Sequence, residues 1–457
     1  MRVTVRTPLL RLAAMVLAGG VLIGMSLLGG MPARAATASD CAVGNTLDAA
    51  SSSASDIQLK LDDPTVSLIC LRGTFSVTTI LNYQHSVTLF GLPSAVLQVP
   101  APVLPATGNG ILTTDATDTL TVQNLRFTGG RMPAGFGGAI FGDTVNVIDS
   151  TFDDNQASRG GAIAASALTI NGSSFTNNSS DRGGAIDSTS ATIMTSTFAD
   201  NTATSFGGAI VTGLLTLDSS TFDSNSAGTL GGAIAADVVD VTNSTFVGNS
   251  VSDVTGRGAT LVISSGTVQQ STFRGNLINK PSGGQAIWAS GNDLLVVRGN
   301  IFADDNGRTE IAIDGNTPVA TDEGGNLFTT DQVTENYFTA AATVDASTHF
   351  GLSSAAIFGS SVLADNGGSV QTIALPANSI AINAVPGAST ITRDARGATR
   401  TAPNDAGAFE YVPPTPALAA TGAQTQGLLG SAAALLAVTL MGGGVLLTRL
   451  SRRTTAR

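Results

Sequence analysis

The sequence is poor in the residue types that usually build catalytic and metal sites. Its 457 residues include two histidines, two cysteines, one tryptophan and three tyrosines, and only 12% of them are charged. His85 and His349 lie far apart, so no His and Cys spacing matches a metal site. No Ser/His/Asp arrangement or phosphate-binding loop stands out either. We therefore predict no metal and no bound cofactor.

Basic residues are also few, and the formal net charge is −11. The two ends that we predict to be removed carry eight arginines and no acid, so the mature body has a charge of −19. Such a body repels phosphate backbones, which makes nucleic acid an unfavoured partner. Hydrophobic residues reach 42%, too many for a disordered chain. The 53 glycines suit a β-rich repeat protein with tight turns.

The N-terminus has the order of a secretory signal peptide. Three arginines among the first 11 residues precede an apolar run over residues 12–28, and Ala33-Arg34-Ala35 forms a small-residue cleavage site. We predict signal cleavage between Ala35 and Ala36, with a second candidate cut after Ala38. An uncleaved membrane anchor is the alternative, which the short and glycine-broken apolar run disfavours.

The C-terminus has three parts in a fixed order. Leu418-Ala419-Ala420-Thr421-Gly422 precedes an apolar stretch over residues 428–448, which is long enough to cross a bilayer, and an arginine-rich tail follows. The pentapeptide resembles the L-A-x-T-G variant of the L-P-x-T-G sorting motif of high-GC Gram-positive bacteria. The resemblance implies that a sortase cuts between Thr421 and Gly422 and joins Thr421 to peptidoglycan. A plain transmembrane anchor is the alternative, and both place the body outside the cell.

The only two cysteines, Cys41 and Cys70, both lie in the first segment of the mature chain. Because the chain carries an export signal, a disulfide between them is the natural prediction. It would close a loop of about 30 residues and add roughly 3 kcal/mol. Two free, buried thiols are the alternative.

Internal repeats determine the predicted fold. Phenylalanines recur at intervals of 23 to 29 residues, at Phe127, Phe152, Phe175, Phe198, Phe222, Phe246, Phe273, Phe302 and Phe328. Glycine pairs recur with the same spacing, and the first five of the six continue as G-G-A-I. They are Gly137-Gly138, Gly160-Gly161, Gly183-Gly184, Gly207-Gly208, Gly231-Gly232 and Gly283-Gly284. An asparagine follows most of the phenylalanines by three positions, at Asn155, Asn178, Asn201, Asn225, Asn249 and Asn276.

The repeat predicts an all-β chain, a single-stranded right-handed parallel β-helix. The period is too short for the common helical repeats, and short alternations such as Leu215-Thr216-Leu217-Asp218 favour strands. Coils of about three strands would stack about 4.8 Å apart. Phenylalanine would then stack on phenylalanine inside, asparagine would bond at a turn, and the glycine pair would form a sharp corner.

The G-G-A-I and F-x-x-N units resemble the repeat of the chlamydial polymorphic outer membrane proteins, over roughly residues 125–328. This resemblance implies a β-helix displayed on a bacterial surface. Residues 363–372, 379–383, 392–397 and 405–410 resemble segments that close the C-terminal end of related secreted β-helices, although Ile380 stands where those have proline. The fold is also that of the pectin-lyase-like enzymes, which cleave polysaccharides.

Candidate catalytic residues are sparse. The acidic pairs Asp153-Asp154 and Asp304-Asp305 follow a coil phenylalanine, and adjacent strand residues point to opposite faces, so we expect turn residues rather than catalytic pairs. Arg159 and Arg182 precede Gly-Gly in neighbouring coils and would lie near Asp153 and Asp181. They make either a surface ion-pair network or a contact for a sugar acid. Trp288, Tyr83, Tyr337 and Tyr411 do not cluster along the repeat as an aromatic platform.

These observations favour a wall-anchored protein of the Gram-positive cell surface that acts as a non-enzymatic adhesion, binding or structural module. A surface-attached polysaccharide lyase or glycoside hydrolase is the alternative. The partners would be sortase, peptidoglycan and an extracellular glycan or protein ligand, and only the C-terminal segment would contact the membrane. The predicted divisions are a signal peptide (1–35), a cap with the first coils (36–105), the β-helix (106–411), a Pro-rich linker (412–417) and the sorting signal with its transmembrane segment and basic tail (418–457).

Overall fold

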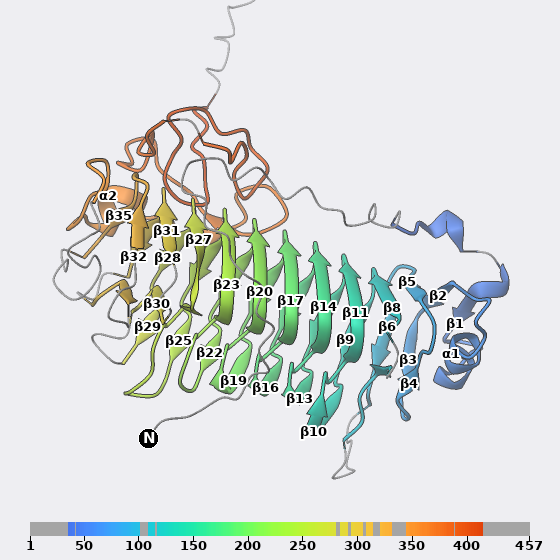
Figure 1. Cartoon of the computed structure of the whole chain (residues 1–457). Helices are drawn as coiled ribbons and strands as arrows, with labels where there is room; N and C mark the ends of the chain where they lie inside the picture. Colours follow the sequence, from blue (N-terminus) through green and yellow to red (C-terminus); the bar gives the residue numbers. More distant parts are fainter. Residues whose placement is uncertain are drawn as a thin grey trace, which may run out of the picture.

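In the computed structural model, successive turns of chain stack along one axis as a parallel β-helix (Figure 1). The structure describes residues 35–41, 43–100, 108–114, 117–279, 284–290, 294–304, 308–313, 320–330, 344–387 and 389–414. The predicted signal peptide, sorting motif Leu418–Gly422 and apolar stretch 428–448 lie outside these residues. Within the described ranges, no helix is long and apolar enough to cross a membrane.

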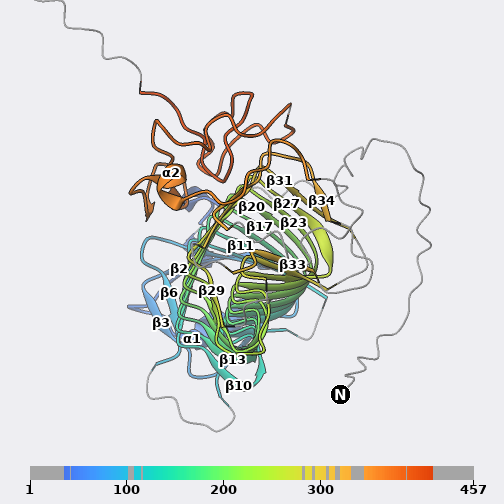
Figure 2. The ribbon, with the colours of Figure 1, turned by 90° about the vertical axis from the view of Figure 1, so that its left-hand side faces the viewer.

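Three sheets enclose the core, of which sheets A and B run the length of the helix and sheet C follows its middle coils, from β10 to β29 (Figure 2). Sheet A is made of β1 (Thr46–Asp48), β2 (Leu68–Arg72), β4 (Leu81–Asn82), β5 (Val87–Gly91), β7 (Leu112–Thr113), β8 (Thr119–Gln123), β11 (Ile140–Ile148), β14 (Ile163–Asn171), β17 (Ile186–Met194), β20 (Ile210–Asp218), β23 (Ile234–Thr242), β26 (Leu261–Ile263), β27 (Ser265–Gln269), β30 (Ile287–Ala289), β31 (Leu295–Arg298), β33 (Ile311–Ile313) and β34 (Ala320–Asp322).

The 11-stranded sheet B is made of β3 (Thr74–Ser76), β6 (Val96–Gln98), β9 (Arg126–Thr128), β12 (Thr151–Asp153), β15 (Ser174–Thr176), β18 (Thr197–Ala199), β21 (Thr221–Asp223), β24 (Thr245–Val247), β28 (Thr272–Arg274), β32 (Ile301–Ala303) and β35 (Leu327–Phe328). Sheet C is made of β10 (Arg131–Phe136), β13 (Gln156–Arg159), β16 (Ser179–Arg182), β19 (Thr202–Phe206), β22 (Ser226–Ala227), β25 (Ser250–Val251) and β29 (Leu277–Ile278). Each coil contributes one strand to sheet B, so its 11 strands correspond to about 11 coils. These stacked parallel coils confirm the predicted all-β architecture.

The phenylalanine ladder lies inside sheet B, where Phe152, Phe175 and Phe198 pair in register on neighbouring strands. From Phe127 to Phe328 the ring centroids of successive coils lie 4.7 to 5.1 Å apart, close to the spacing of parallel strands. All these rings are fully buried. The stacking that the sequence predicted is therefore the main hydrophobic core.

Each glycine of the Gly-Gly corner is required for a different reason, as Gly183 and Gly184 show. Gly183 has φ of +63°, a left-handed conformation that other residues rarely adopt. A Cβ atom on Gly184 would lie 2.0 Å from the carbonyl oxygen of Gly208 in the next coil. The corner thus needs one glycine for its turn and one for the close approach of neighbouring coils.

The asparagines form a second ladder, buried at the turn that follows sheet B. The Nδ2 of Asn178 donates to Asn201 Oδ1 at 3.0 Å and to the carbonyl oxygen of Phe152 at 3.0 Å. The same Asn201 oxygen accepts the backbone N–H of Asn178 at 3.1 Å. Each side chain thus satisfies polar groups of two neighbouring coils, as expected for a buried turn.

The N-terminal end of the helix is covered by α1 (Ala54–Leu61), which buries Ile57 and Leu61 in the main core (Figure 1). The short helices η1 (Ala38–Asp40) and η2 (Val43–Asn45) precede it. Capping is expected here because an open end of a β-helix exposes strand edges and core.

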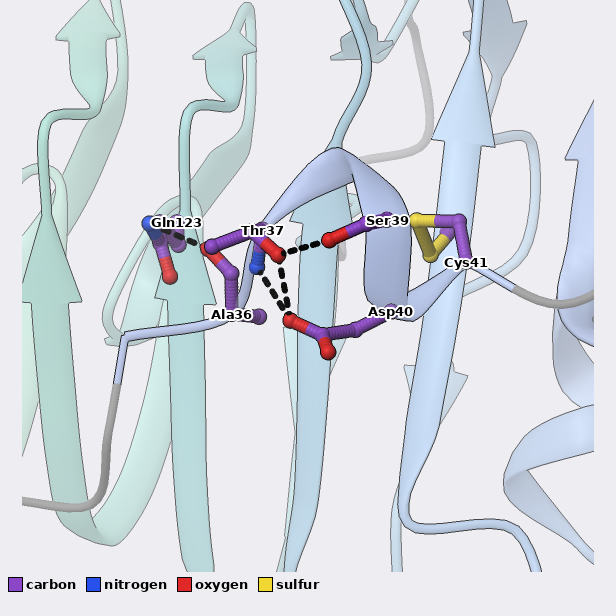
Figure 3. Close-up of a disulfide and its surroundings, with 7 residues drawn as sticks. Ala36, Thr37, Ser39, Asp40, Cys41 and Gln123 are labelled. Atoms are coloured by element: carbon purple, nitrogen blue, oxygen red, sulfur yellow. Dashed lines mark hydrogen bonds between the residues drawn. A yellow bond between two sulfur atoms is a disulfide. The ribbon is translucent and has the colours of Figure 1, made fainter. Parts of the chain in front are cut away.

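A disulfide between Cys41 and Cys70 fastens the segment before α1, as predicted (Figure 3). Cys70 is buried in β2 beside Phe90 and Leu92. The Nε2 of Gln123, at the end of β8, donates to the carbonyl oxygen of Ala36 at 3.0 Å. Ala35 and Ala36, the predicted cleavage point, thus lie against the outer side of sheet A.

The parallel coils end sooner than the predicted boundary at residue 411. Phe350 stacks on Phe328 at 4.9 Å, and beyond it the chain forms α2 (Ser354–Phe358) and an antiparallel pair, β36 (Leu363–Ala364) with β37 (Thr372–Ile373). Residues 352–387 and 389–411 then pack against the flank of the later coils, and Phe358, Ile373 and Phe409 belong to a second buried cluster (Figure 1). Without the spaced phenylalanine and Gly-Gly units, this segment cannot continue the ladders.

Candidate functional site

A groove runs along the corner where sheet C meets sheet A. Two adjoining hollows of about 430 and 280 Å³ form it, and both are lined by Arg159, Asp187 and Ser188. Their linings extend from Thr114 to Ser290. These ends are seven coil steps apart, so the groove is roughly 34 Å long. Its length suits an extended ligand rather than a small compact one.

A row of side chains that we call the corner row runs beside the groove, and its members Phe136, Arg159, Arg182 and Phe206 line one wall. These residues occupy equivalent positions immediately before the glycine corner, and strand or bridge pairing connects each to the next. The corner row consists of Phe136, Arg159, Arg182, Phe206, Leu230 and Arg257.

A second set, the floor row, takes one residue from each repeat. That residue directly follows A-I or the two residues equivalent to it. Its members pair in register across sheet A. The floor row consists of Phe141, Ala164, Asp187, Val211, Ala235, Val262 and Trp288.

A third set of small or acidic residues completes the lining, and we call it the rim row. Each member lies two positions after the floor-row residue of the same coil. The rim row consists of Asp143, Ser166, Thr189, Gly213, Asp237, Ser264 and Ser290. Hydroxyl and carboxylate groups thus lie on one side of the groove, and guanidinium groups and rings lie on the other. This combination can form hydrogen bonds with a polyhydroxylated ligand.

Arg159 and Asp187 form the most ordered polar contact of the groove. Arg159 donates from Nε to Asp187 Oδ2 at 2.8 Å and from Nη2 to Asp187 Oδ1 at 2.9 Å. The bond to Asp187 raises the pKa of Arg159, with burial acting in the opposite direction. A two-point pair of this kind fixes both side chains and keeps the guanidinium charged.

Arg182 lies one coil further and is less fully bonded. Its Nε lies 4.0 Å from Asp187 Oδ2, and this buried nitrogen has no hydrogen-bond partner within the described parts of the chain. Register pairing confirms that Arg159 and Arg182 are equivalent positions.

The carboxylate that pairs with Arg159 and Arg182 is Asp187 rather than Asp153 or Asp181, the acids that the sequence places near them. Asp153 binds Arg126 at 2.7 Å, and Asp181 accepts hydrogen bonds from Ser158 and Thr204. Arg159 and Arg182 instead reach across the glycine corner to sheet A, where Asp187 lies.

Aromatic rings accompany the arginines along the groove. The guanidinium carbon of Arg159 lies 5.4 Å from the ring centroid of Phe136, and that of Arg182 lies 6.0 Å from Phe206. Arg257 lies 4.5 Å from the ring centroid of Trp288, which continues the floor row. These distances are typical of cation–π contacts. Phe136 keeps 45% of its surface exposed, so apolar ring area also faces solvent.

The two acidic pairs noted in the sequence lie elsewhere. Asp153 and Asp154 bind different arginines, Arg126 and Arg131, as expected for side chains on opposite faces. Asp304 accepts the backbone N–H of Asn276 at the end of the asparagine ladder, and Asp305 lies outside the described residues. Across the described ranges, no group of three His, Cys, Asp or Glu residues could hold a metal ion.

Sequence inspection identified two of the arginines but missed the groove. An aromatic platform was expected from tryptophan and tyrosine, whereas the rings that line the groove are Phe136, Phe141 and Phe206, which do not belong to the inner ladder. A usable signal exists, because the corner and floor rows lie at fixed offsets from each glycine corner. Reading only those positions down the repeats would have brought arginines and aromatics together.

The coils that carry the groove also match a known family. Residues 137–302 match the family model for a right handed beta helix region. The match extends from the first Gly-Gly corner to the phenylalanine of β32 and agrees with the stacked parallel coils. No curated protein matches the sequence. Since β-helices of this kind include both polysaccharide-cleaving enzymes and surface proteins, function has to be argued from the groove itself.

Proposed function

We propose that the chain is a binding module of the bacterial cell surface, and that the groove holds an extended ligand without cleaving it. The main support is Asp187, the central carboxylate of the groove, because Arg159 donates to both of its oxygens. Both oxygens of this carboxylate are engaged by a guanidinium, so it is poorly placed to attack a sugar or to contact a leaving group.

The other groove carboxylates are too far apart to act together. Asp143 and Asp237 line different parts of the groove, on β11 and β23. These strands are separated by four coil steps, which is about 19 Å. Glycoside hydrolases need two carboxyl groups about 5 to 9.5 Å apart. Direct cooperation between these two groups is therefore excluded.

A lyase would need a base that can remove a proton. The described residues that line both hollows include no histidine, lysine or tyrosine. Arg159 is a poor candidate because its bond to Asp187 raises its pKa further. Binding is therefore favoured over the alternative of a polysaccharide lyase or hydrolase.

The test is to offer the protein acidic and neutral polysaccharides, with and without calcium. We expect retention of a polysaccharide by the protein with no increase in reducing ends or unsaturated products. Asp187→Asn serves as the matched variant, since an enzyme that used this carboxylate would lose its turnover. Steady product formation by the wild type that is lost in Asp187→Asn would contradict the binding proposal.

We propose further that the chain is displayed from the wall of a Gram-positive bacterium, with sortase and peptidoglycan as partners. The order of Leu418–Gly422, apolar stretch and basic tail supports this display. The resemblance of the G-G-A-I and F-x-x-N units to the polymorphic outer membrane protein repeat supports it as well.

Thr421→Ala is expected to shift the protein from the covalent wall fraction to the membrane and medium, because sortase joins its substrate through the threonine carbonyl. Thr425→Ala, a like change four residues away, should leave the wall fraction unchanged. Extraction of the wall with a muralytic enzyme measures both. Equal wall retention of Thr421→Ala and wild type would remove the sortase proposal.

A further inference from the structure

We infer that the α-ammonium group of Ala36, which signal cleavage after Ala35 would release, binds the side-chain oxygen of Gln123 on the outer side of sheet A. The inference concerns the N-terminal end of the chain and is independent of the groove. It rests on the predicted cleavage point, where water would split the Ala35–Ala36 peptide bond. Ala35 then leaves with a carboxylate, and Ala36 keeps its nitrogen as an ammonium.

The site is a hollow of about 340 Å³ beside the segment that leads to the disulfide. Sheet A contributes Gln123, Thr88 and Ile148 to its lining, and the N-terminal segment contributes Ala36 and Asp40. In Figure 3, Ala36 lies between Gln123 and Asp40. The end of the mature chain is therefore already part of the hollow.

Gln123 has an acceptor at this place that is not used. Its Nε2 donates to the carbonyl oxygen of Ala36 at 3.0 Å, and this bond fixes the orientation of the amide because a carbonyl oxygen can only accept. The side chain keeps 5% of its surface exposed, and its Oε1 is buried with no partner among the described residues. A buried acceptor without a donor is costly, and most such groups in proteins are satisfied.

The cap contains a completed version of the same contact. Gln58 of α1 donates from Nε2 to the carbonyl oxygen of Asn82 at 2.8 Å, and its Oε1 accepts the backbone N–H of Asn82 at 2.8 Å. Gln123 makes the first of these two bonds to Ala36 and lacks the second. In the uncut chain the nitrogen of Ala36 has one hydrogen, whose direction the peptide plane fixes. An ammonium has three, so one of them can turn toward Gln123 Oε1 while the carbonyl stays in place.

The charge of the hollow also suits an ammonium. Asp40 Oδ2 accepts the backbone N–H of Thr37 at 2.7 Å and its hydroxyl at 2.6 Å, which holds this carboxylate against the segment. Asp40 is the only charged side chain among the described residues that line the hollow. The Cys41–Cys70 disulfide fixes the far end of the segment. The bound terminus would thus fasten the near end, and only after export, since the precursor lacks the ammonium.

Acylation of amines at pH 7, followed by mass spectrometry of the modified peptides, tests whether the terminus is bound in the secreted full-length protein. We expect the α-amine of Ala36 to react at least 10-fold more slowly in the wild type than in Gln123→Leu, because hydrogen bonds to the charged form lower the share of neutral amine that reacts. Lys60, one of two lysines in the chain, is the internal reference and should react equally in both.

Gln269→Leu is the matched control, because Gln269 occupies the register position of Gln123 further along sheet A, in β27. It should leave the reaction of Ala36 as slow as in the wild type. Gln123→Glu keeps an acceptor for the ammonium and should also keep the reaction slow, which separates loss of the acceptor from disturbance of the fold.

The pH profile of the reaction gives a second measurement. Its midpoint should lie above the ordinary α-amine pKa of about 8 in the wild type and close to it in Gln123→Leu. Equal reactivity of the Ala36 amine in wild type and Gln123→Leu would overturn the inference, as would a fast reaction in Gln123→Glu. N-terminal sequencing of the same sample establishes the cut, and a mature chain that begins elsewhere, such as at Ser39, would overturn it as well.

Discussion

Phe198→Ala is expected to lower the free energy of unfolding by about 3 to 5 kcal/mol, the range for removing a large buried aromatic side chain. The ring is fully buried and lies 4.8 Å from Phe175 and 4.7 Å from Phe222. Its loss leaves a cavity between two rings that are held at the strand spacing, so the neighbouring coils cannot close the gap. The loss also removes two ring contacts from the ladder.

Chemical denaturation followed by circular dichroism measures this change. Leu214→Ala is the control from the same coil, because Leu214 is a large apolar side chain with 56% of its surface exposed. We expect that control to stay within about 0.5 kcal/mol of the wild type. A loss below 1 kcal/mol in Phe198→Ala would show that the ladder does not carry the stability assigned to it.

Arg400→Met is expected to destabilise the segment on the flank of the coils by about 3 to 5 kcal/mol. Arg400 is completely buried and donates to Glu410 Oε2 at 3.2 Å, to Asn243 Oδ1 at 2.8 Å and to the carbonyl oxygen of Gly407 at 2.8 Å. Burial lowers the pKa of Arg400, and Glu410 opposes that shift most strongly. Removing the guanidinium leaves Glu410 buried without its counter-charge.

Limited proteolysis and hydrogen exchange of residues 389–414 measure the effect, since this segment should open before the coils do. Arg393→Met is the matched control, because Arg393 is exposed and donates to the carbonyl oxygen of Gly397. Arg400→Met combined with Glu410→Leu should recover part of the stability, since Glu410 then no longer lies buried without its counter-charge. Identical protection of the segment in wild type and Arg400→Met would contradict the role given to this ion pair.

The sequence predicted the coils because the residues that face inward repeat most regularly. Phe198, Asn201 and Gly207 each meet their own kind in the coils above and below, so their spacing shows the stacking directly. The predicted disulfide followed from a similarly simple constraint, two cysteines in one exported segment.

The groove and the flanking segment were much harder to predict. The residue type changes from coil to coil along the corner and floor rows, so no motif marks them. Phe206 occupies the position of Arg182 in the next coil, and Val211 occupies that of Asp187. The contact between Arg400 and Asn243 joins residues 157 positions apart in the sequence. No periodic pattern connects such distant residues, and only the folded chain brings them together.

The most direct test of the binding groove uses Trp288, the only tryptophan of the chain. Arg257 lies over its ring, and Trp288 pairs in register with Val262, which lines the groove, so a ligand at this end of the groove is expected to change the surroundings of the indole. Titration with the polysaccharide that the protein retains should give a saturable change in tryptophan emission, shifted to higher concentrations in Arg182→Gln, because Arg182 lines the groove. Emission that stays constant while the polysaccharide is retained would place the ligand elsewhere and contradict the proposed groove.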